Sequence, residues 1–380
     1  MGSKRSKDKL NIAMLGHKRI PSREGGIEVV VEELSTRMVK KGYSVTCYNR
    51  KGHNVAGAQY DIKTYSSYHG VKCIEVFTIN KKGLAAMSSS VFAAIRAAFG
   101  KYDVVHFHAE GPAFMCWLPK FFGKRVIVTV HGLDHQRAKW GKLASAYIML
   151  GEKNAVRFAD EIIVLSQGVK DYFMSTYGRE TQFIPNGVNV PKIRPAELIT
   201  KKYGLFPDSY FLYLGRLVPE KGEEYLINAF KKVKTDKKLV IAGGSSDTDE
   251  FMSYLKNLAK GDDRILFTGF VQGRMKHELY SNAYAYTLPS DLEGMPLSLL
   301  EGMSYGNCCL TSDIPECAEV VEDKAVTFKK SDVEDLIEKL QMLCDDEKLV
   351  TSYRAVARSF ILKKYGWDDV VDRTIELYRG

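Results

Sequence analysis

Short apolar runs alternate with amphipathic stretches along almost the whole chain. The runs are rich in β-branched and aromatic residues, which favours strands, and the stretches between them repeat apolar positions at helical spacing. In the first half the predicted strands are Leu10–Leu15, Ser44–Tyr48, Val71–Phe77, Asp103–Phe107, Arg125–Val130 and Glu161–Leu165. In the second half they are Tyr210–Leu214, Lys238–Ala242, Ile265–Thr268, Ala283–Leu288 and Asn307–Leu310.

The stretches between these runs predict helices that cover the strands. After the first strand, one helix face would carry Ile27, Val30, Val31, Leu34 and Met38. Helical spacing recurs in the second half at Glu223–Val233, Asp249–Ala259 and Pro296–Met303. A regular alternation of strand and helix predicts βα units and mostly parallel sheets.

The chain is long enough for two domains, since 380 residues exceed what one hydrophobic core usually supports. The segment Pro185–Ser209 carries four prolines and interrupts the rhythm, so it predicts an interdomain connection. We therefore expect an α/β fold with two doubly wound, Rossmann-like domains that face each other across a cleft. Ligands of such sheets bind beyond the carboxyl ends of the strands. The expected division is residues 1–188, a connection at 189–209, a second domain at 210–362, and a C-terminal helix at 363–380 that packs back toward the first domain.

Charge and cysteine content narrow the classes of partner and compartment. The formal net charge is +9, which favours an anionic partner such as a phosphate ligand, a nucleic acid or an anionic membrane surface. The seven cysteines include no Cys-x-x-Cys pair, so a disulfide framework or a zinc site is not expected. No apolar run reaches the length of a membrane span. We expect a cytoplasmic protein, at most peripheral on the inner face of a membrane.

The segment Ser290–Gly306, SDLEGMPLSLLEGMSYG, contains a pair of glutamates at the start of a predicted helix. Pro296 suits the first helical position, which places Glu293 on the loop and Glu301 inside the helix. Free backbone N–H groups at a helix N-terminus form a ready site for a diphosphate. Here those groups would belong to Met295, Leu297 and Ser298.

Glu301 is flanked in the sequence by Leu299, Leu300 and Met303, which predicts an apolar setting for its carboxylate. A buried carboxylate needs a polar partner, and a ribose diol would supply two donors. Two ordinary glutamates near a helix end are the alternative interpretation.

The stretch GRLVPEKG, Gly215–Gly222, follows the first predicted strand of the second half. Its two cations, Arg216 and Lys221, are placed to converge on a leaving diphosphate, where negative charge grows in the transition state. A solvated basic turn is the alternative.

Together these motifs resemble glycosyltransferase family 4, whose members are retaining, nucleotide-sugar-dependent enzymes of the GT-B fold. The resemblance rests on Gly25–Gly26 before a helix, on GRLVPEKG and on the glutamate pair in EGMPLSLLE. Their order and spacing agree with the family from Leu10 to about Tyr378.

The resemblance implies a role for each matching residue. Glu301 would hold the nucleotide ribose, and Glu293 would contact the transferred sugar. Arg216 and Lys221 would neutralise the diphosphate, and His131, in TVHGLD, would reach the sugar or phosphate from the N-terminal side. The other implied donor-binding residues are Gly25, Gly26, Gly269, Phe270, Val271, Gly294, Met295, Pro296 and Leu297.

The sequence departs from the family pattern at two places. Gly302 stands where alanine is common after the second glutamate, and a helical glycine costs about 1 kcal/mol relative to alanine. Met295–Pro296 replaces the usual Phe-Gly, which would alter the pocket around the sugar.

Three histidines lie at the ends of predicted strands of the first half. His106 and His108 alternate, so they fall on one face of their strand, and His17 ends another. A metal site would need ligands that the sequence does not place, so structural or acceptor-lining roles are favoured.

The resemblance implies transfer of a sugar, hexosyl or N-acetylhexosaminyl, from a nucleoside-diphosphate donor to a hydroxyl, with no cofactor and no metal. UDP is the expected donor nucleotide. A carbohydrate or lipid-linked sugar is the expected acceptor, in cell-surface polysaccharide or glycolipid synthesis. A GT-B-fold sugar-nucleotide epimerase and a non-catalytic nucleotide-sugar-binding protein are the alternatives. Nucleic acid is not expected as a partner. Only the positive net charge suggests it, and no stacking-platform motif or recognition helix accompanies that charge.

A peripheral contact with an anionic bilayer is a further hypothesis. It rests on basic residues of the first half with aromatic neighbours, against the alternative of a solvated face over core aromatics. The basic residues are Lys18, Arg19, Arg23, Lys81, Lys82, Lys120, Lys124, Arg125, Arg137, Lys139 and Lys142, and the aromatic ones are Phe114, Trp117, Phe121, Phe122 and Trp140.

Overall fold

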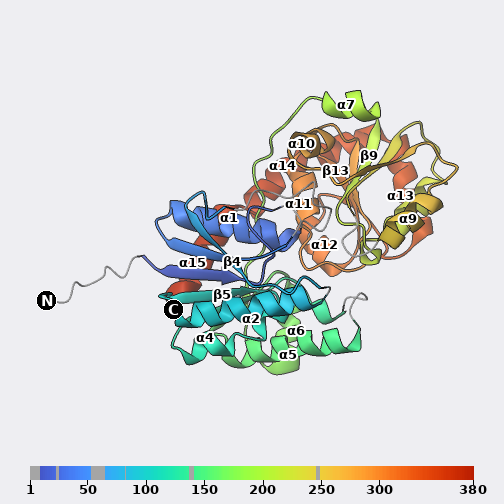
Figure 1. Ribbon diagram of the computed structural model, residues 1–380. Coiled ribbons are helices and arrows are strands. Elements are labelled where there is room, and N and C mark those ends of the chain that lie inside the picture. The colour runs from blue at the N-terminus through green and yellow to red at the C-terminus, as the bar shows by residue number, and fades with distance from the viewer. Residues whose placement is uncertain (1–8, 23–24, 53–64, 82, 137–140, 245–248) are drawn as a thin grey trace. The chain divides into compact units, whose positions relative to one another are not determined.

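The chain forms two compact units, each a sheet with helices on both faces (Figure 1). The computed structural model describes residues 9–22, 25–52, 65–81, 83–136, 141–244 and 249–380. The first unit is Met1–Asn186 together with Trp367–Gly380, and the second is Gly187–Gly366. The predicted α/β architecture of two parallel-sheet, Rossmann-like domains is confirmed.

The sheet of the first unit has eight strands in the order β3-β4-β2-β1-β5-β6-β7-β8. Neighbouring strands are parallel except at the β3–β4 edge, which is antiparallel. The strands are β1 Asn11–Leu15, β2 Ser44–Arg50, β3 Ser67–Tyr68, β4 Val71–Val76, β5 Val104–His108, β6 Arg125–Val130, β7 Glu161–Val164 and β8 Gln182–Phe183.

Helices cover both faces of this sheet. Figure 1 shows α1 and α15 on one face and α2, α4, α5 and α6 on the other. The helices are α1 Gly26–Lys40, α2 Leu84–Phe99, α3 Glu110–Ala113, α4 Trp117–Phe121, η2 Asp134–Gln136, α5 Lys142–Phe158, α6 Gln167–Tyr177 and α15 Trp367–Arg379. The last helix packs on α1 and belongs to the first unit.

The sheet of the second unit has six parallel strands in the order β11-β10-β9-β12-β13-β14. Its strands are β9 Tyr210–Leu214, β10 Lys238–Ala242, β11 Ile265–Gly269, β12 Ala285–Leu288, β13 Cys308–Ser312 and β14 Val326–Phe328. Its helices are α7 Leu198–Tyr203, η3 Pro219–Lys221, α8 Glu223–Phe230, α9 Asp249–Leu258, α10 Gly273–Ser281, α11 Leu297–Ser304, α12 Pro315–Val321, α13 Val333–Asp345 and α14 Glu347–Lys364.

The predicted strands all exist, with ends that shift by one or two residues. The predicted helix Glu223–Val233 ends earlier, at Phe230, because the last two amides of the predicted range, those of Lys232 and Val233, bond three residues back instead of four. The predicted helix start at Pro296 is also wrong by one residue. Pro296 is the N-cap, and α11 begins at Leu297.

The segment expected as the interdomain connection, 189–209, lies in the second unit and contains α7. The carboxylate of Glu278 on α10 accepts hydrogen bonds from the backbone N–H groups of Glu197, Leu198 and Ile199, at 2.9, 2.6 and 3.2 Å. These bonds fix the start of α7 to α10. The second unit accordingly begins at Gly187 and ends at Gly366, outside the expected limits of 210 and 362.

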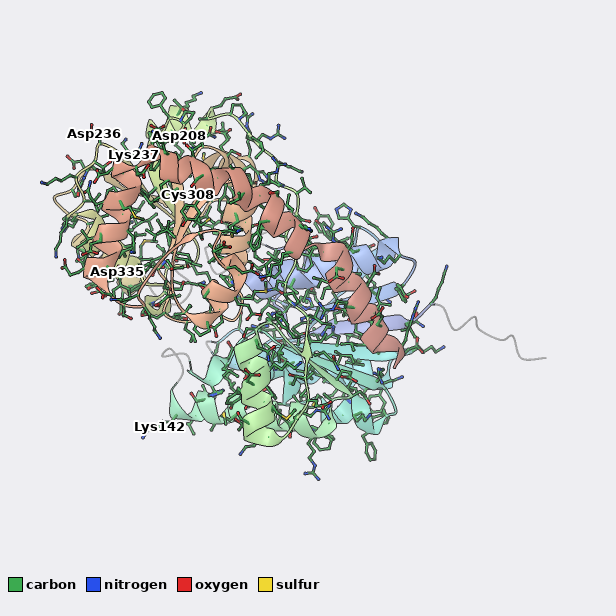
Figure 2. All side chains as sticks on the ribbon, turned by 180° about the vertical axis from the view of Figure 1, so that it is seen from behind. Lys142, Asp208, Asp236, Lys237, Cys308 and Asp335 are labelled. Atoms are coloured by element: carbon green, nitrogen blue, oxygen red, sulfur yellow. The ribbon has the colours of Figure 1, made fainter. Side chains whose placement is uncertain are left out.

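No helix among the described residues is long and apolar enough to cross a membrane. All seven cysteines are free, and six are buried, among them Cys308 of β13 (Figure 2).

The buried carboxyl group of Glu223 stabilises the turn that follows β9. Glu223, the first residue of α8, has no exposed surface. It accepts hydrogen bonds from the hydroxyl of Tyr213 at 2.7 Å and from the N–H of Val218 at 3.3 Å. Burial raises the pKa of Glu223 to about 8, although these hydrogen bonds and Lys221 oppose the shift. At neutral pH this carboxyl group is therefore largely protonated.

A raised pKa in the folded state links stability to pH at this residue. The unfolded chain should show a pKa of about 4.3 for this group, so the folded protein binds the proton more tightly. The stabilisation that the bound proton gives the folded protein is fully present below about pH 4.3. It is lost as the pH rises toward 8, the pKa in the folded state. We expect the free energy of unfolding of wild type to fall relative to Glu223→Gln between pH 5 and 8, by up to about 1.4 kcal/mol per pH unit.

Urea unfolding followed by circular dichroism at several pH values measures this difference. Glu334→Gln, a change of an exposed glutamate on α13, is the matched control and should follow wild type. Parallel pH profiles for wild type and Glu223→Gln would contradict the assignment.

Candidate active site

The predicted chemistry of the second half gathers at the carboxyl edge of the second sheet. From β9 the chain adds β10 and β11 on one side, and it then returns to place β12 on the other side of β9. Strands β9 and β12 therefore flank the switch point, where ligands of doubly wound sheets bind. The loop after β9 carries Arg216 and Lys221, and the loop after β12 carries Glu293.

The two loops are joined by their backbones. The N–H of Asp291 donates to the carbonyl of Glu220 at 2.9 Å, and the hydroxyl of Tyr225 donates to the Asp291 carboxylate at 2.8 Å. Gly222 has a φ of +71°, and a Cβ there would lie 2.0 Å from the carbonyl oxygen of Pro289. Only glycine permits this approach, so the motif's final glycine sets the spacing of the loops.

Lys221 and Glu293 form a buried ion pair between these loops. The Lys221 Nζ lies 2.5 Å from Oε1 of Glu293, and the side chains are 13% and 7% exposed. The hydroxyl of Ser290 donates to the same carboxylate oxygen at 2.7 Å. Two residues that are 72 positions apart in the sequence thus meet directly.

Arg216 lies in the same turn, and it is half-buried. Its carbonyl oxygen accepts a hydrogen bond from Tyr213 at 2.9 Å. Among the described residues, no ion pair involves its guanidinium group. Arg216 is therefore a cation of this edge whose charge is not balanced by a neighbouring carboxylate.

Glu301 has a partner that the sequence did not reveal. Lys276 of α10 places its Nζ 2.6 Å from Oε1 of Glu301, and the two side chains are 20% and 31% exposed. The predicted apolar setting of Glu301 is wrong. Helical periodicity turns Leu299, Leu300 and Met303 into the core and leaves Glu301 on the more open side of α11.

Gly302 has a packing reason that outweighs its low helix propensity. A Cβ at this position would lie 2.8 Å from the ring of Tyr286, which is fully buried in β12. The large tyrosine ring occupies the space that an alanine methyl group would need. The departure from the family pattern is thus compensated by Tyr286.

The N-terminus of α11 lies on the same edge as the ion pair. Its first backbone hydrogen bonds run from the N–H groups of Leu299 and Leu300 to the Pro296 carbonyl. The N–H groups of Leu297 and Ser298 come before these bonds, so they have no acceptor within the helix. Gly294 and Pro296 are buried beside them, and Met295 is half-buried.

The turn Gly269–Val271 follows β11 at the same edge of the sheet. Gly269 has a φ of +71°. Strand β11 is two strands away from β9, which corresponds to about 10 Å at the usual spacing. The turn therefore lies on the same edge of the sheet as the loop after β9.

In the first unit, histidines gather at the carboxyl edge of β1, β5 and β6. Nδ1 of His108 lies 3.1 Å from Nε2 of His131, and the rings of His106 and His108 stack at 4.2 Å. Burial lowers the pKa of His17 to about 4 and of His106 to about 3, so both are neutral at pH 7.

His106 has a structural role. It lies 2.6 Å from the Tyr378 hydroxyl and 2.7 Å from the Thr129 hydroxyl, which occupy both ring nitrogens. His131, after β6, is half-buried and faces His108.

Gly25 and Gly26 form the N-cap and the first residue of α1. A Cβ at Gly25 would lie 2.7 Å from the carboxylate of Glu28, which also accepts a hydrogen bond from the N–H of Lys18 at 2.9 Å. Although burial raises the pKa of Glu28, Lys18 and its neighbours lower it below the usual value. The glycine loop is therefore fitted around a buried anionic side chain.

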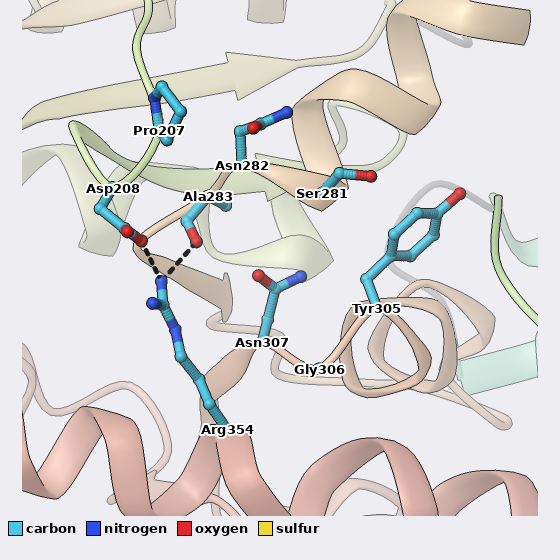
Figure 3. Close-up of a pocket in the computed structure, with 9 residues that line it drawn as sticks. All are labelled: Pro207, Asp208, Ser281, Asn282, Ala283, Tyr305, Gly306, Asn307 and Arg354. Carbon is cyan, nitrogen blue, oxygen red and sulfur yellow. Dashed lines mark hydrogen bonds and ion pairs between the residues drawn. The ribbon is translucent and has the colours of Figure 1, made fainter. Parts of the chain in front are cut away.

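A polar pocket lies at the opposite, amino edge of the second sheet (Figure 3). Arg354 of α14 occupies it and donates to Asp208 at 2.5 Å and to the carbonyls of Ala283 and Tyr284 at 2.7 Å. Lys237 donates to the carbonyl of Asp208 nearby, at 2.9 Å (Figure 2). The cations at this pocket, Arg354 and Lys237, thus donate to groups of the protein itself. The pocket is not the site that the motifs predict.

Comparison with known proteins places the chain in a family. Residues 24–192 match the family described as Glycosyltransferase Family 4, and residues 197–360 match the one described as Glycosyl transferases group 1. An uncharacterized glycosyltransferase of Methanocaldococcus jannaschii is 24% identical over 404 aligned positions, covering 97% of this chain and 98% of the relative.

Two further proteins are similar to the chain. The UDP-Gal:alpha-D-GlcNAc-diphosphoundecaprenol alpha-1,3-galactosyltransferase of Escherichia coli is 28% identical over 302 positions, covering 73% of this chain and 75% of the relative. The solved structure of Anabaena HepE in complex with UDP and glucose has a TM-score of 0.78 at 15% identity, covering 97% of this chain and 98% of that one. The chain therefore belongs to glycosyltransferase family 4, and its two Rossmann-like units are those of the GT-B fold.

Proposed function

We propose that this glycosyltransferase moves a hexosyl or N-acetylhexosaminyl group from a UDP-sugar to a hydroxyl of a carbohydrate or lipid-linked acceptor. The observation that carries the proposal is the joining of the two charged loops at the switch point of the second sheet. Arg216, Lys221 and Glu293 all lie there, beside the N-terminus of α11.

The charge balance of this edge favours a diphosphate ligand. Lys221 and Glu293 neutralise each other, as do Lys276 and Glu301. Arg216 remains, and its planar guanidinium group suits a phosphate. A donor diphosphate would add negative charge that Arg216 and Lys221 can share, while Glu293 accepts from hydroxyls of the sugar and Glu301 from the ribose.

We further propose that transfer proceeds with retention of the anomeric configuration. The bond between the anomeric carbon and the diphosphate oxygen breaks as the acceptor oxygen bonds to the same face of that carbon. The acceptor proton passes to the departing phosphate oxygen. Arg216, Lys221 and the N–H groups of α11 stabilise the charge that develops on the leaving group. No metal is assigned to this step, and the role of His131 stays a prediction.

The named relatives support a UDP-sugar donor and a lipid-linked or polysaccharide acceptor. The Escherichia coli relative is named for UDP-Gal and a diphosphoundecaprenol acceptor, and the Anabaena structure holds UDP and glucose. We propose the same donor class for this chain, in cell-surface polysaccharide or glycolipid synthesis in the cytoplasm.

A thermal shift experiment with UDP, GDP, dTDP and ADP tests the donor site. Ligand at 100 times its Kd stabilises a protein by about 2.7 kcal/mol, which corresponds to a rise in Tm of several degrees. We expect UDP to raise the Tm of wild type, and Glu301→Ala to abolish most of that rise because the ribose contact is lost. Glu334→Ala, the removal of an exposed glutamate of the same unit, should keep it.

Three results would oppose the proposal. No shift with any nucleotide would remove the donor site. An epimerised donor without a transfer product would indicate an epimerase, and binding without turnover over a broad acceptor panel would indicate a binding protein.

We also propose that an aromatic patch on the first unit contacts an anionic membrane surface. The patch consists of exposed apolar side chains on α2, on α4 and at the C-cap of α4, and the two helices pack together: Phe92, Ile95, Phe99, Trp117, Phe121 and Phe122. Phe99 is 68% exposed and Phe121 81% exposed. The rings of Phe99 and Phe122 lie 4.5 Å apart, so the patch is continuous across the two helices.

Cations border this patch. Arg96 and Lys101 are exposed on α2 or next to it, and Lys120 of α4 is exposed and forms an ion pair with Asp160. Apolar side chains beside cations suit insertion between anionic headgroups. Of the residues predicted for this contact, Arg23, Lys82, Arg137, Lys139 and Trp140 lie outside the described residues. Phe114 is half-buried against Tyr147 and lies outside the patch.

Co-sedimentation with liposomes tests the membrane contact. We expect wild type to bind vesicles that contain phosphatidylglycerol more tightly than neutral ones. The double variant Phe99→Ser/Phe121→Ser should bind at least about 10-fold more weakly, since each buried aromatic ring contributes roughly 1.5–3 kcal/mol. Phe206→Ser, at a phenylalanine of the second unit that is 58% exposed, is the control. Binding that is insensitive to anionic lipid and to the double variant would remove the proposal.

A further inference from the structure

Three side chains from separate elements of the first unit converge on one another. Glu110 begins α3, His135 lies in η2, and Glu152 lies in the middle of α5. We call them the carboxylate–histidine cluster. Both glutamates have no exposed surface, and the His135 side chain is 16% exposed.

Each carboxylate of the cluster has one oxygen that is held by a neutral donor. One oxygen of Glu152 accepts from the hydroxyls of Tyr172 and Tyr177, at 2.9 and 2.5 Å. One oxygen of Glu110 accepts from the backbone N–H of Asp134 at 2.8 Å. These contacts fix the orientation of both carboxylates.

The other oxygen of each carboxylate is buried and forms no hydrogen bond, and the same is true of Nδ1 of His135. These three atoms face one another. The His135 Nδ1 lies 3.4 Å from Oε2 of Glu152 and 3.8 Å from Oε1 of Glu110. One possible ligand atom from each of the three residues lies within 4.8 Å of those of the other two. A tetrahedral ion with bonds of about 2.0–2.1 Å separates its ligand atoms by roughly 3.4 Å, so the spacing is close to that of a ligand set.

Among the described residues, His135 is the only cationic partner of the two carboxylates, and even when protonated it balances one charge of the two. Two buried carboxylates need a cation or a proton, because an uncompensated charge in the interior is costly. Within the described part of the chain, the only ion-pair contacts of Glu110 and Glu152 are those to His135.

The backbone brings the two glutamates together through a glycine. A Cβ at Gly151 would lie 2.0 Å from the carbonyl oxygen of Glu110, so only glycine lets α5 lie against the start of α3. Glu152 follows directly in α5. The meeting of the two carboxylates is therefore fixed by helix packing rather than by flexible side chains.

We infer that Glu110, His135 and Glu152 bind one divalent transition-metal ion in the first unit, with Zn²⁺ the closest match to the donor set. One imidazole nitrogen and two carboxylate oxygens are ligands that Zn²⁺ accepts, and the small exposure of His135 leaves room for a water as the fourth. Mg²⁺ and Ca²⁺ prefer six or more oxygen ligands, so they fit less well. The ion holds η2 to α3 and α5, and it takes no part in the proposed sugar transfer.

Calorimetric titration of the full chain with zinc chloride, after removal of metals with a chelator, tests this site. We expect one tight site in wild type and no comparable binding of Mg²⁺ or Ca²⁺. Glu152→Gln and His135→Ala should weaken zinc binding more than about 100-fold. Tyr177→Phe removes only a supporting hydrogen bond and should weaken it by about 10- to 100-fold.

Matched variants separate this site from other zinc ligands. His69→Ala removes an exposed histidine of the same unit, and Glu161→Gln removes a partly exposed glutamate. Both should bind zinc as wild type does. His131→Ala should also leave binding unchanged, because His131 belongs to the separate histidine group.

The proposal fails if metal-free wild type binds no zinc, which would leave a shared proton as the balancing charge. It also fails if His131→Ala removes binding while His135→Ala does not. Should the cluster variants not fold, anomalous diffraction from zinc-soaked wild-type crystals decides the question. A peak between Glu110, His135 and Glu152 supports the site, and no peak there overturns it.

Discussion

The second unit depends on the contact between the loops that follow β9 and β12. Gly222 brings the loops to backbone distance, and the Lys221–Glu293 ion pair then forms largely out of contact with water. Removing one partner of such a pair leaves the other charge buried alone, which costs about 3–5 kcal/mol. The pair therefore fixes how the two loops meet, and the positions of Arg216 and the start of α11 follow from that arrangement.

This constraint lets the same residues serve both folding and the ligand binding that we propose. The lysines at 221 and 276 each neutralise a glutamate, so they are stable in the absence of substrate. Only Arg216 has no carboxylate partner among the described residues of this edge. The buried carboxyl group of Glu223 supports the turn from the other side through Tyr213 and Val218. An anionic ligand thus meets a preformed edge with one unbalanced positive charge, as electrostatic preorganisation requires.

Much of the fold and part of the site were predictable from the sequence. Parallel strands are buried on both faces, so β9 and β10 appear as continuous apolar runs, whereas β3 and β8, with two residues each, are too short to show a pattern. Arg216, Lys221 and Glu293 lie in recognisable motifs, but the ion pair between Lys221 and Glu293 was not predicted, because the two residues lie 72 positions apart. Lys276 was missed because it reaches Glu301 from another helix, and the cluster around Glu110 because a helix contact at Gly151 creates it. The environment of Gly302 likewise depends on Tyr286, a residue of another element.

The central claim is that the donor binds at the carboxyl edge of the second sheet, between Arg216 and the start of α11. A crystal structure of the protein with UDP tests this most directly. We expect the diphosphate against Arg216, Lys221 and the N–H groups of α11, with the ribose at Glu301. UDP bound elsewhere, for example in the amino-edge pocket around Asp208 and Arg354, would contradict it.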